Sequence, residues 1–167
     1  MEQKNELCTT QKQGERFMKL GLDPHTADMH WHHKDTRIKS LEWELRPYKP
    51  LFFEGDGIKM MEKFATATNT FNEKMNFKKS PKETAKSYYD RTHGKDIPAW
   101  SLNALLKIIP KHIQDVGDLE IGVNGDEWKV SYIMGFCGRK NVGGKSLFNA
   151  IIELVEWLLE NGHLSNR

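Results

Sequence analysis

Histidines gather near the start of the chain in a pattern that can bind a metal ion. The cluster comprises His25, Asp28, His30, His32 and His33, with Cys8 upstream. A structural zinc site usually takes four ligands in two close pairs, such as C-x2-C with H-x3-H, and neither pair is present. His30 and His32 would share one face of a strand, because side chains alternate along a strand. We therefore expect a solvated connector and assign no metal or cofactor site, with metal binding as the alternative.

The densest positive charge lies between residues 74 and 89. This stretch combines lysines with aromatic rings: Lys74, Lys78, Lys79, Lys82 and Lys86, near Phe77, Tyr88 and Tyr89. Interleaved rings and cations can bind single-stranded nucleic acid by stacking and phosphate contact. Arginine, the better phosphate reader, is almost absent there. The alternative is a solvated helical face whose aromatic rings turn inward.

The segment from Gly138 to Ser146 invites comparison with a phosphate-binding loop, but its spacing differs. That motif needs four residues between its first glycine and Gly-Lys-Ser, and five residues separate Gly138 from Gly144. We expect a plain loop between a strand and a helix. Because no G-x-S-x-G motif occurs and Cys137 has no assignable base, we also expect no enzymatic activity.

Composition is consistent with one ordinary intracellular domain. The 167 residues include 25 Lys and Arg against 23 Asp and Glu, for a net charge of +2. So small an excess predicts no strong attraction to nucleic acid or membranes. Two cysteines form no disulfide framework. The sequence shows no signal peptide and no apolar run long enough to span a bilayer. We expect a soluble, cytoplasmic protein.

Helix caps and hydrophobic periodicity predict the elements of the first two thirds. Thr10 with Gln13 forms a capping box for a helix over residues 11–20, and Ser80 with Glu83 forms another for a helix from Pro81 to before Gly94. We further expect a turn after Asp23-Pro24, a strand near Leu41–Leu45, and a helix after Ser101 that ends at Pro110. A helix from Ile58 would place apolar or small residues at helical spacing: Met61, Phe64, Ala65, Thr68, Phe71 and Met75.

The last third predicts a hairpin followed by a helix. Alternating apolar residues over about 119–134 flank Asn124-Gly125, which favours a type I′ turn. Ser146 can begin a helix over about 146–160, and Gly162 can end it. We predict an α+β fold in which a small antiparallel sheet is packed by this helix, itself covered by the helix at 101–109. The single domain would span residues 9–164, with flexible ends at 1–8 and 165–167.

Three segments carry a family resemblance. They are LGLDPHTADM at Leu20–Met29, IPAWSLNALL at Ile97–Leu106, and EWLLENGHL at Glu156–Leu164. Together they resemble a family of uncharacterised small proteins encoded by phages, prophages and mobile elements of gut bacteria. The resemblance implies an α+β domain of phage-type origin and implies no reaction. Against that family, residues 54–95 look like a charged helical insertion.

We therefore expect a non-enzymatic accessory protein of a phage or mobile element. It would act through contact with an unknown protein partner and would not bind a membrane. Candidates for an exposed contact are Trp31, Trp43, Phe52 and Phe53. The alternative is a nucleic-acid-binding accessory protein that uses the basic stretch at 74–89.

Overall fold

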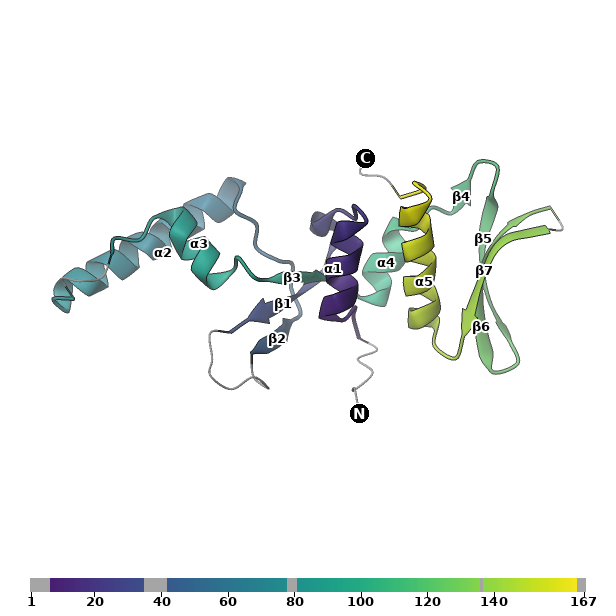
Figure 1. Cartoon of the computed structure of the whole chain (residues 1–167), viewed down its shortest axis with the longest axis horizontal. Helices are drawn as coiled ribbons and strands as arrows, with labels where there is room; N and C mark the ends of the chain where they lie inside the picture. Colours follow the sequence, from purple (N-terminus) through teal and green to yellow (C-terminus); the bar gives the residue numbers. More distant parts are fainter. Residues whose placement is uncertain (1–6, 35–41, 78–80, 136, 165–167) are drawn as a thin grey trace. The chain divides into compact units, whose positions relative to one another are not determined.

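The computed structural model describes residues 7–34, 42–77, 81–135 and 137–164 and has the α+β fold that the sequence predicts (Figure 1). The chain divides into two compact units: unit 1 comprises residues 1–29 and 98–167, and unit 2 comprises residues 30–97. The expected insertion at 54–95 lies within unit 2. Of the expected flexible ends, residues 1–6 and 165–167 lie outside the described residues. In the described part of the chain, no helix is long and apolar enough to cross a bilayer.

Unit 1 contains an antiparallel sheet with the strand order β4-β5-β6-β7. Its strands are β4 (His112–Ile113), β5 (Gly117–Asn124), β6 (Glu127–Met134) and β7 (Cys137–Gly144). The predicted hairpin is confirmed, because β5 pairs with β6 up to Asn124 opposite Glu127. Its central residues are Gly125 and Asp126, so the expected position of the turn was wrong by one residue. Only Gly125 of these two has a positive φ, 63°. This fits a type II′ turn, because a type I′ turn needs positive φ at both central residues.

The expected loop at 138–146 is mostly strand β7. Its backbone pairs with β6 from Met134 opposite Cys137 to Trp128 opposite Gly144. Glycine is depleted in strands, and the three glycines of this segment therefore hid the strand in the sequence. Pairing with β6 and burial of Val142, which is 3% exposed, override that weak local preference.

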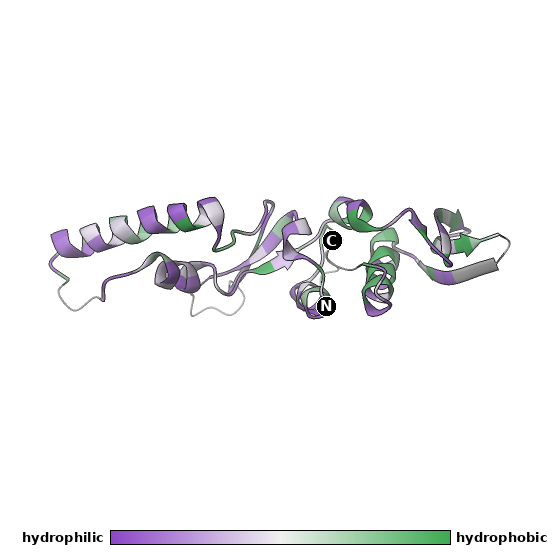
Figure 2. Ribbon diagram, turned by 90° about the horizontal axis from the view of Figure 1, so that it is seen from above, coloured by the Kyte–Doolittle hydropathy of each residue, from purple (hydrophilic) through white to green (hydrophobic). Residues whose placement is uncertain are grey.

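The C-terminal helix α5 (Leu147–Glu160) packs on β6 and β7 and contacts α4 (Leu102–Ile108). Both of its predicted ends are confirmed: Ser146 Oγ accepts a hydrogen bond from the Asn149 amide, and Gly162 has a φ of 70°. Eight residues of α5 are buried: Phe148, Ala150, Ile151, Ile152, Leu154, Val155, Leu158 and Leu159. Figure 2 shows hydrophobic colours over most of α4 and α5. The expected layering of sheet, α5 and α4 is therefore confirmed.

The start of unit 1 is formed by α1 (Gln11–Lys19) and the short 3₁₀ helix η1 (Pro24–Thr26). Both follow their predicted caps: the capping box of Thr10 and Gln13 is present, and the Asp23 carboxylate accepts a hydrogen bond from the His25 amide. These local signals specify the two elements because each cap satisfies backbone N–H groups that have no partner within the helix.

The segment around Trp100 has a structural role in unit 1. Trp100 is fully buried, its ring meets Phe17 edge-on at 5.7 Å, and its Nε1 donates to Thr26 Oγ1 at 2.9 Å. Ser101 caps α4, while its own amide donates to Asp28 Oδ1 at 2.9 Å. Trp100 and Ser101 thus connect three segments of unit 1.

Unit 2 combines strands with two helices. Strand β1 (Met29–His33) pairs with β2 (Trp43–Arg46) in antiparallel fashion. The sheet has the strand order β2-β1-β3, and of β3 (Ile97–Ala99) only Ile97 falls within unit 2. The helices α2 (Gly55–Lys74) and α3 (Ala85–Thr92) pack against each other. The strand expected near Leu41–Leu45 is therefore confirmed over residues 43–46.

Helix α3 begins later than predicted. Thr84 caps it in a capping box with Ser87, whereas the expected start was Pro81, with Ser80 as its cap. The reason is a contact with α2: Asn69 Nδ2 donates to the Glu83 carbonyl, and the Glu83 amide donates to Asn69 Oδ1, both at 2.8 Å. Because both backbone groups of Glu83 are bound from outside, this residue is not part of a helix, and α3 starts just after it. Ser80 itself lies outside the described residues.

The apolar residues of α2 divide between two faces. Met61 and Ala65 are buried, but Phe64, Phe71 and Met75 are 47%, 57% and 54% exposed. The predicted helix is confirmed over Gly55–Lys74, and its apolar residues are divided between a buried face and an exposed one. Helix α3 has 8 residues against 20 in α2 and covers only part of it.

Candidate functional site

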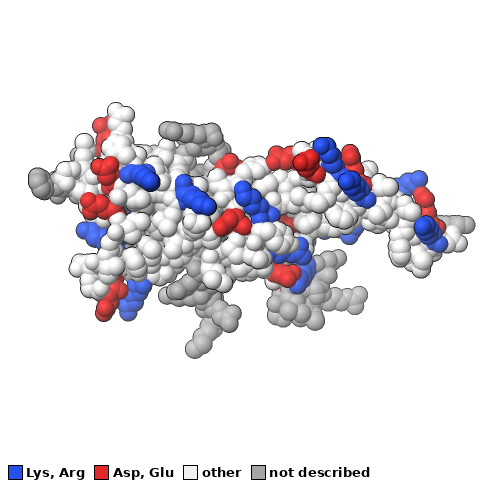
Figure 3. All heavy atoms as spheres, turned by 180° about the vertical axis from the view of Figure 1, so that it is seen from behind, with Lys and Arg blue, Asp and Glu red and all other residues white. Residues whose placement is uncertain are grey.

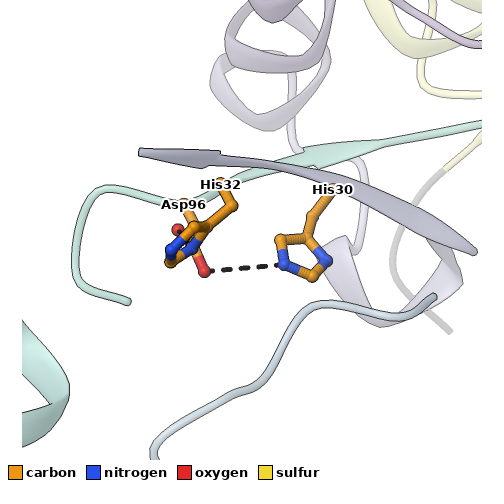
Figure 4. Close-up of side chains that lie close together, drawn as sticks. All are labelled: His30, His32 and Asp96. Atoms are coloured by element: carbon orange, nitrogen blue, oxygen red, sulfur yellow. Dashed lines mark hydrogen bonds and ion pairs between the residues drawn. The ribbon is translucent and has the colours of Figure 1, made fainter. Parts of the chain in front are cut away.

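Ionisable side chains of unit 2 come together in one largely buried cluster, of which Figure 4 shows His30, His32 and Asp96. Strand β1 places His30 and His32 on the same face, as the alternation of side chains requires. Asp96 stands just before β3, and His93 is the C-cap of α3. We call these four residues the His–Asp cluster.

Asp96 is the acceptor at the centre of the His–Asp cluster. Its side chain is 4% exposed. His32 Nδ1 donates to Oδ1 and His93 Nδ1 donates to Oδ2, each at 2.8 Å, and the His33 amide donates to Oδ1 at 3.3 Å. Burial acts to raise the pKa of Asp96, but the His93 hydrogen bond and the nearby histidines outweigh it, so this pKa lies below its ordinary value. Asp96 is therefore a carboxylate at neutral pH.

His30 is the most buried member of the cluster, with a side chain that is 1% exposed. Its Nδ1 donates to the Tyr48 carbonyl at 2.9 Å, so Nε2 carries the lone pair of the neutral ring. Burial lowers the pKa of His30, despite the opposing effects of the Tyr48 hydrogen bond and of Asp96. Nε2 lies 3.7 Å from Asp96 Oδ2 and has no hydrogen-bond partner among the residues that the structure describes.

The cluster offers two kinds of metal-ligand atom, imidazole nitrogen and carboxylate oxygen. One such atom from each of His30, His32 and Asp96 lies within 4.8 Å of the other two. This set can hold a divalent cation or, without one, a network of hydrogen bonds around a buried charge. The expectation of a solvated connector is wrong for these histidines.

The other members of the predicted histidine cluster lie elsewhere. His33 Nε2 bonds Glu42 Oε1 at 3.0 Å, and Asp28 accepts from Ser101. His25 and Cys8 belong to unit 1, where Cys8 is fully buried and pairs with Ser101 in an isolated bridge. Sequence reasoning missed His93 and Asp96, whose three-residue spacing is a signal too weak to indicate a site by itself.

The basic stretch at 74–89 does not form a field of positive charge in the described residues. Lys82 Nζ lies 3.6 Å from Glu73 Oε1, and Lys86 pairs with Asp90. Lys74 is exposed at the end of α2. On the face shown in Figure 3, acidic and basic side chains alternate. Lys78 and Lys79 lie outside the described residues.

The aromatic residues of this stretch are engaged by neighbours. Tyr88 stacks on Phe64 with ring centres 5.8 Å apart, and the Tyr89 hydroxyl donates to the Leu51 carbonyl at 3.0 Å. Phe77 is the exception, at 52% exposure. The four aromatic residues expected as exposed contacts, Trp31, Trp43, Phe52 and Phe53, are each only partly exposed.

Comparison of the chain with protein-family models, curated proteins and solved structures found no match.

Proposed function

We propose that this chain is a non-enzymatic accessory protein that acts through protein–protein contact, and that the contact surface is an apolar stripe on α2. The stripe consists of Met60, Phe64, Phe71 and Met75, which are 38%, 47%, 57% and 54% exposed. The exposure of these four residues is the observation on which the proposal depends. The proposed origin in a phage or mobile element, and the cytoplasmic location, rest on the sequence resemblance and composition alone.

Met60, Phe64 and Phe71 share one face of α2, and Met75, the C-cap of the helix, continues it. At 3.6 residues per turn they fall within a sector of about 60°. The neighbouring face, with Met61 and Ala65, is buried. In Figure 2, hydrophilic and hydrophobic residues occur along the whole length of α2.

Single exposed apolar residues are normal on protein surfaces. Four large apolar residues along one helix face, spaced as in helices that dock into an apolar groove, favour a binding face. Methionine and phenylalanine are also the residues that adaptable interfaces enrich.

The spacing of the stripe is symmetric, with intervals of 4, 7 and 4 residues. An antiparallel second copy of α2 would therefore bring Met60 to Met75 and Phe64 to Phe71, with the small Ala67 at the crossing. Two-fold contacts of this kind are the commonest in protein assemblies. A second copy of the chain is the partner that this spacing fits best.

A photo-crosslinking residue at position 71 tests the proposal. The matched control is position 66, because Thr66 is also exposed on α2 but lies outside the stripe. We expect crosslinking from position 71, to a second copy or to one defined protein in cells that carry the gene, and none from position 66. Equal or absent crosslinking at the two positions would refute the contact surface.

Nucleic-acid binding by the 74–89 stretch is the second candidate. It is favoured by the exposed ring of Phe77 and the exposed Lys74, which are three residues apart in the sequence. Proteins that bind single-stranded nucleic acid combine such rings, which stack on bases, with cations that contact phosphates. The pairing of Lys82 and Lys86 with acidic side chains weakens it.

A further inference from the structure

We infer that the His–Asp cluster binds one divalent transition-metal ion of the zinc class, through His30 Nε2, His32 Nδ1 and Asp96, with His93 Nδ1, which now bonds Asp96 Oδ2, turning towards the ion as the fourth donor. The inference does not depend on the α2 stripe, because it concerns other side chains and another chemistry.

The first argument is the buried lone pair of His30. Nearly all buried polar atoms in folded proteins have a partner, yet within the described part of the chain Nε2 of this buried ring has no hydrogen-bond partner and faces the Asp96 carboxylate. A metal ion would supply the missing partner. The Tyr48 carbonyl, which receives the Nδ1 proton, is the kind of outer hydrogen bond that fixes the tautomer of metal-binding histidines.

The separations within the cluster lie on both sides of those in a tetrahedral site, so the side chains would have to adjust to bind an ion. With bonds of about 2.0–2.1 Å, two ligands of a tetrahedral zinc ion are about 3.3 Å apart. The His30–Asp96 separation of 3.7 Å lies slightly above this value, and the His32–Asp96 and His93–Asp96 separations of 2.8 Å lie below it. The ion would therefore draw together donor atoms that now lie up to 4.8 Å apart and would separate those that now share a hydrogen bond.

The donor types select among metals. Imidazole nitrogens with one carboxylate are typical of zinc and its neighbours in the transition series. Magnesium and calcium prefer sites built almost wholly from oxygen atoms. His32 and His93 now donate their Nδ1 protons to Asp96; as ligands through Nδ1 they would be neutral rings with the proton on Nε2, and a ring that carried two protons would release one to solvent.

Such an ion would connect three parts of unit 2 that are distant in sequence. Its ligands come from β1, from the end of α3 and from the residue before β3. Closing the long segment between His32 and His93 lowers the entropy of the unfolded chain, and metal affinity then appears as folding stability. We therefore assign the ion a structural role in unit 2.

Cobalt substitution tests the site directly. The tag-free chain is stripped with a chelator and titrated with Co²⁺, whose visible absorption reports tetrahedral coordination, and zinc content is measured by elemental analysis. We expect one ion per chain and a loss of metal affinity of at least about tenfold in His30→Ala. Even substitutions of residues that only hydrogen-bond a metal ligand lower the affinity by about 10–100-fold. His112→Ala is the matched control, because His112 bonds Asp118 at the same 2.8 Å but on the surface.

A measurement on the wild-type chain covers the case in which His30→Ala does not fold. Long-range ¹H–¹⁵N spectra of the imidazoles should show zinc shifting the His30, His32 and His93 nitrogens and leaving those of His112 unchanged. Absence of stoichiometric binding, or binding that His30→Ala retains, would overturn the inference; so would zinc shifts at His112 equal to those in the cluster.

Discussion

The side chain of Asn69 holds the backbone of Glu83 by two hydrogen bonds of 2.8 Å, one donated and one accepted. This contact joins the middle of α2 to the residue before the Thr84 cap of α3. It sets where α3 begins, and it ties together the two helices that carry the apolar stripe and His93.

Replacing Asn69 with alanine should loosen α3 from α2. Two backbone groups of Glu83 would lose their partners, and a net hydrogen bond contributes about 0.5–1.5 kcal/mol. We expect a loss of about 1–3 kcal/mol in the local stability of α3, measured as faster amide hydrogen exchange over residues 85–92. Asn72→Ala, on the same helix, serves as the control. Unchanged exchange in Asn69→Ala would show that other contacts hold α3.

Leu158 tests the layered core of unit 1. It is fully buried on α5, so Leu158→Ala should destabilise the chain by about 2–5 kcal/mol, as large-to-small core substitutions do. Glu153→Ala on the exposed face of the same helix should change stability by no more than about 0.5 kcal/mol. Chemical denaturation followed by circular dichroism measures both. Equal effects of the two substitutions would contradict the packing of α5.

The Cys8 thiol should react slowly. Burial, with a smaller effect of the Asp28 charge, raises its pKa from 9.0 to about 11. Because the thiolate is the reactive form, its share at pH 8 should be about a hundredfold lower than that of an ordinary thiol, and reactivity should rise only as pH approaches 11. A Cys137→Ser chain treated with a thiol reagent isolates Cys8. Denaturant should restore a normal rate; a native rate equal to the denatured one would refute the burial of Cys8.

The nucleic-acid alternative predicts salt-dependent binding. Each phosphate neutralised by lysine releases counterions, so affinity should fall steeply with salt. Titration with labelled single- and double-stranded DNA at two salt concentrations measures this, with Lys78→Glu/Lys79→Glu as the variant. We expect no binding at micromolar protein, given the acidic partners of Lys82 and Lys86. Salt-sensitive binding that the variant abolishes would instead establish the alternative.

Features specified by neighbouring residues could be predicted from the sequence. The capping box at Thr10, the N-cap at Ser146, the hairpin at 119–134 and the apolar surface of α5 depend on local hydrogen bonds or on periodicity within one element. Each of these formed as expected, within a residue or two.

Features that depend on distant residues could not be predicted in this way. The glycine-rich β7 exists because β6 pairs with it, and α3 starts late because Asn69 binds Glu83. The His–Asp cluster joins β1 to Asp96 across more than 60 residues. Histidine spacing alone places His30 and His32 on one face, but it gives no information about the carboxylate they meet.

The central claim, that the stripe on α2 serves contact and not folding, is tested most directly by comparing Phe71→Ser with Met61→Ala. Phe71 is 57% exposed and Met61 is 1% exposed. Phe71→Ser should change the free energy of unfolding by less than about 1 kcal/mol and abolish crosslinking from a probe at position 64, whereas Met61→Ala should cost about 2–5 kcal/mol. A loss of stability in Phe71→Ser as large as in Met61→Ala, or crosslinking that survives Phe71→Ser, would contradict the claim.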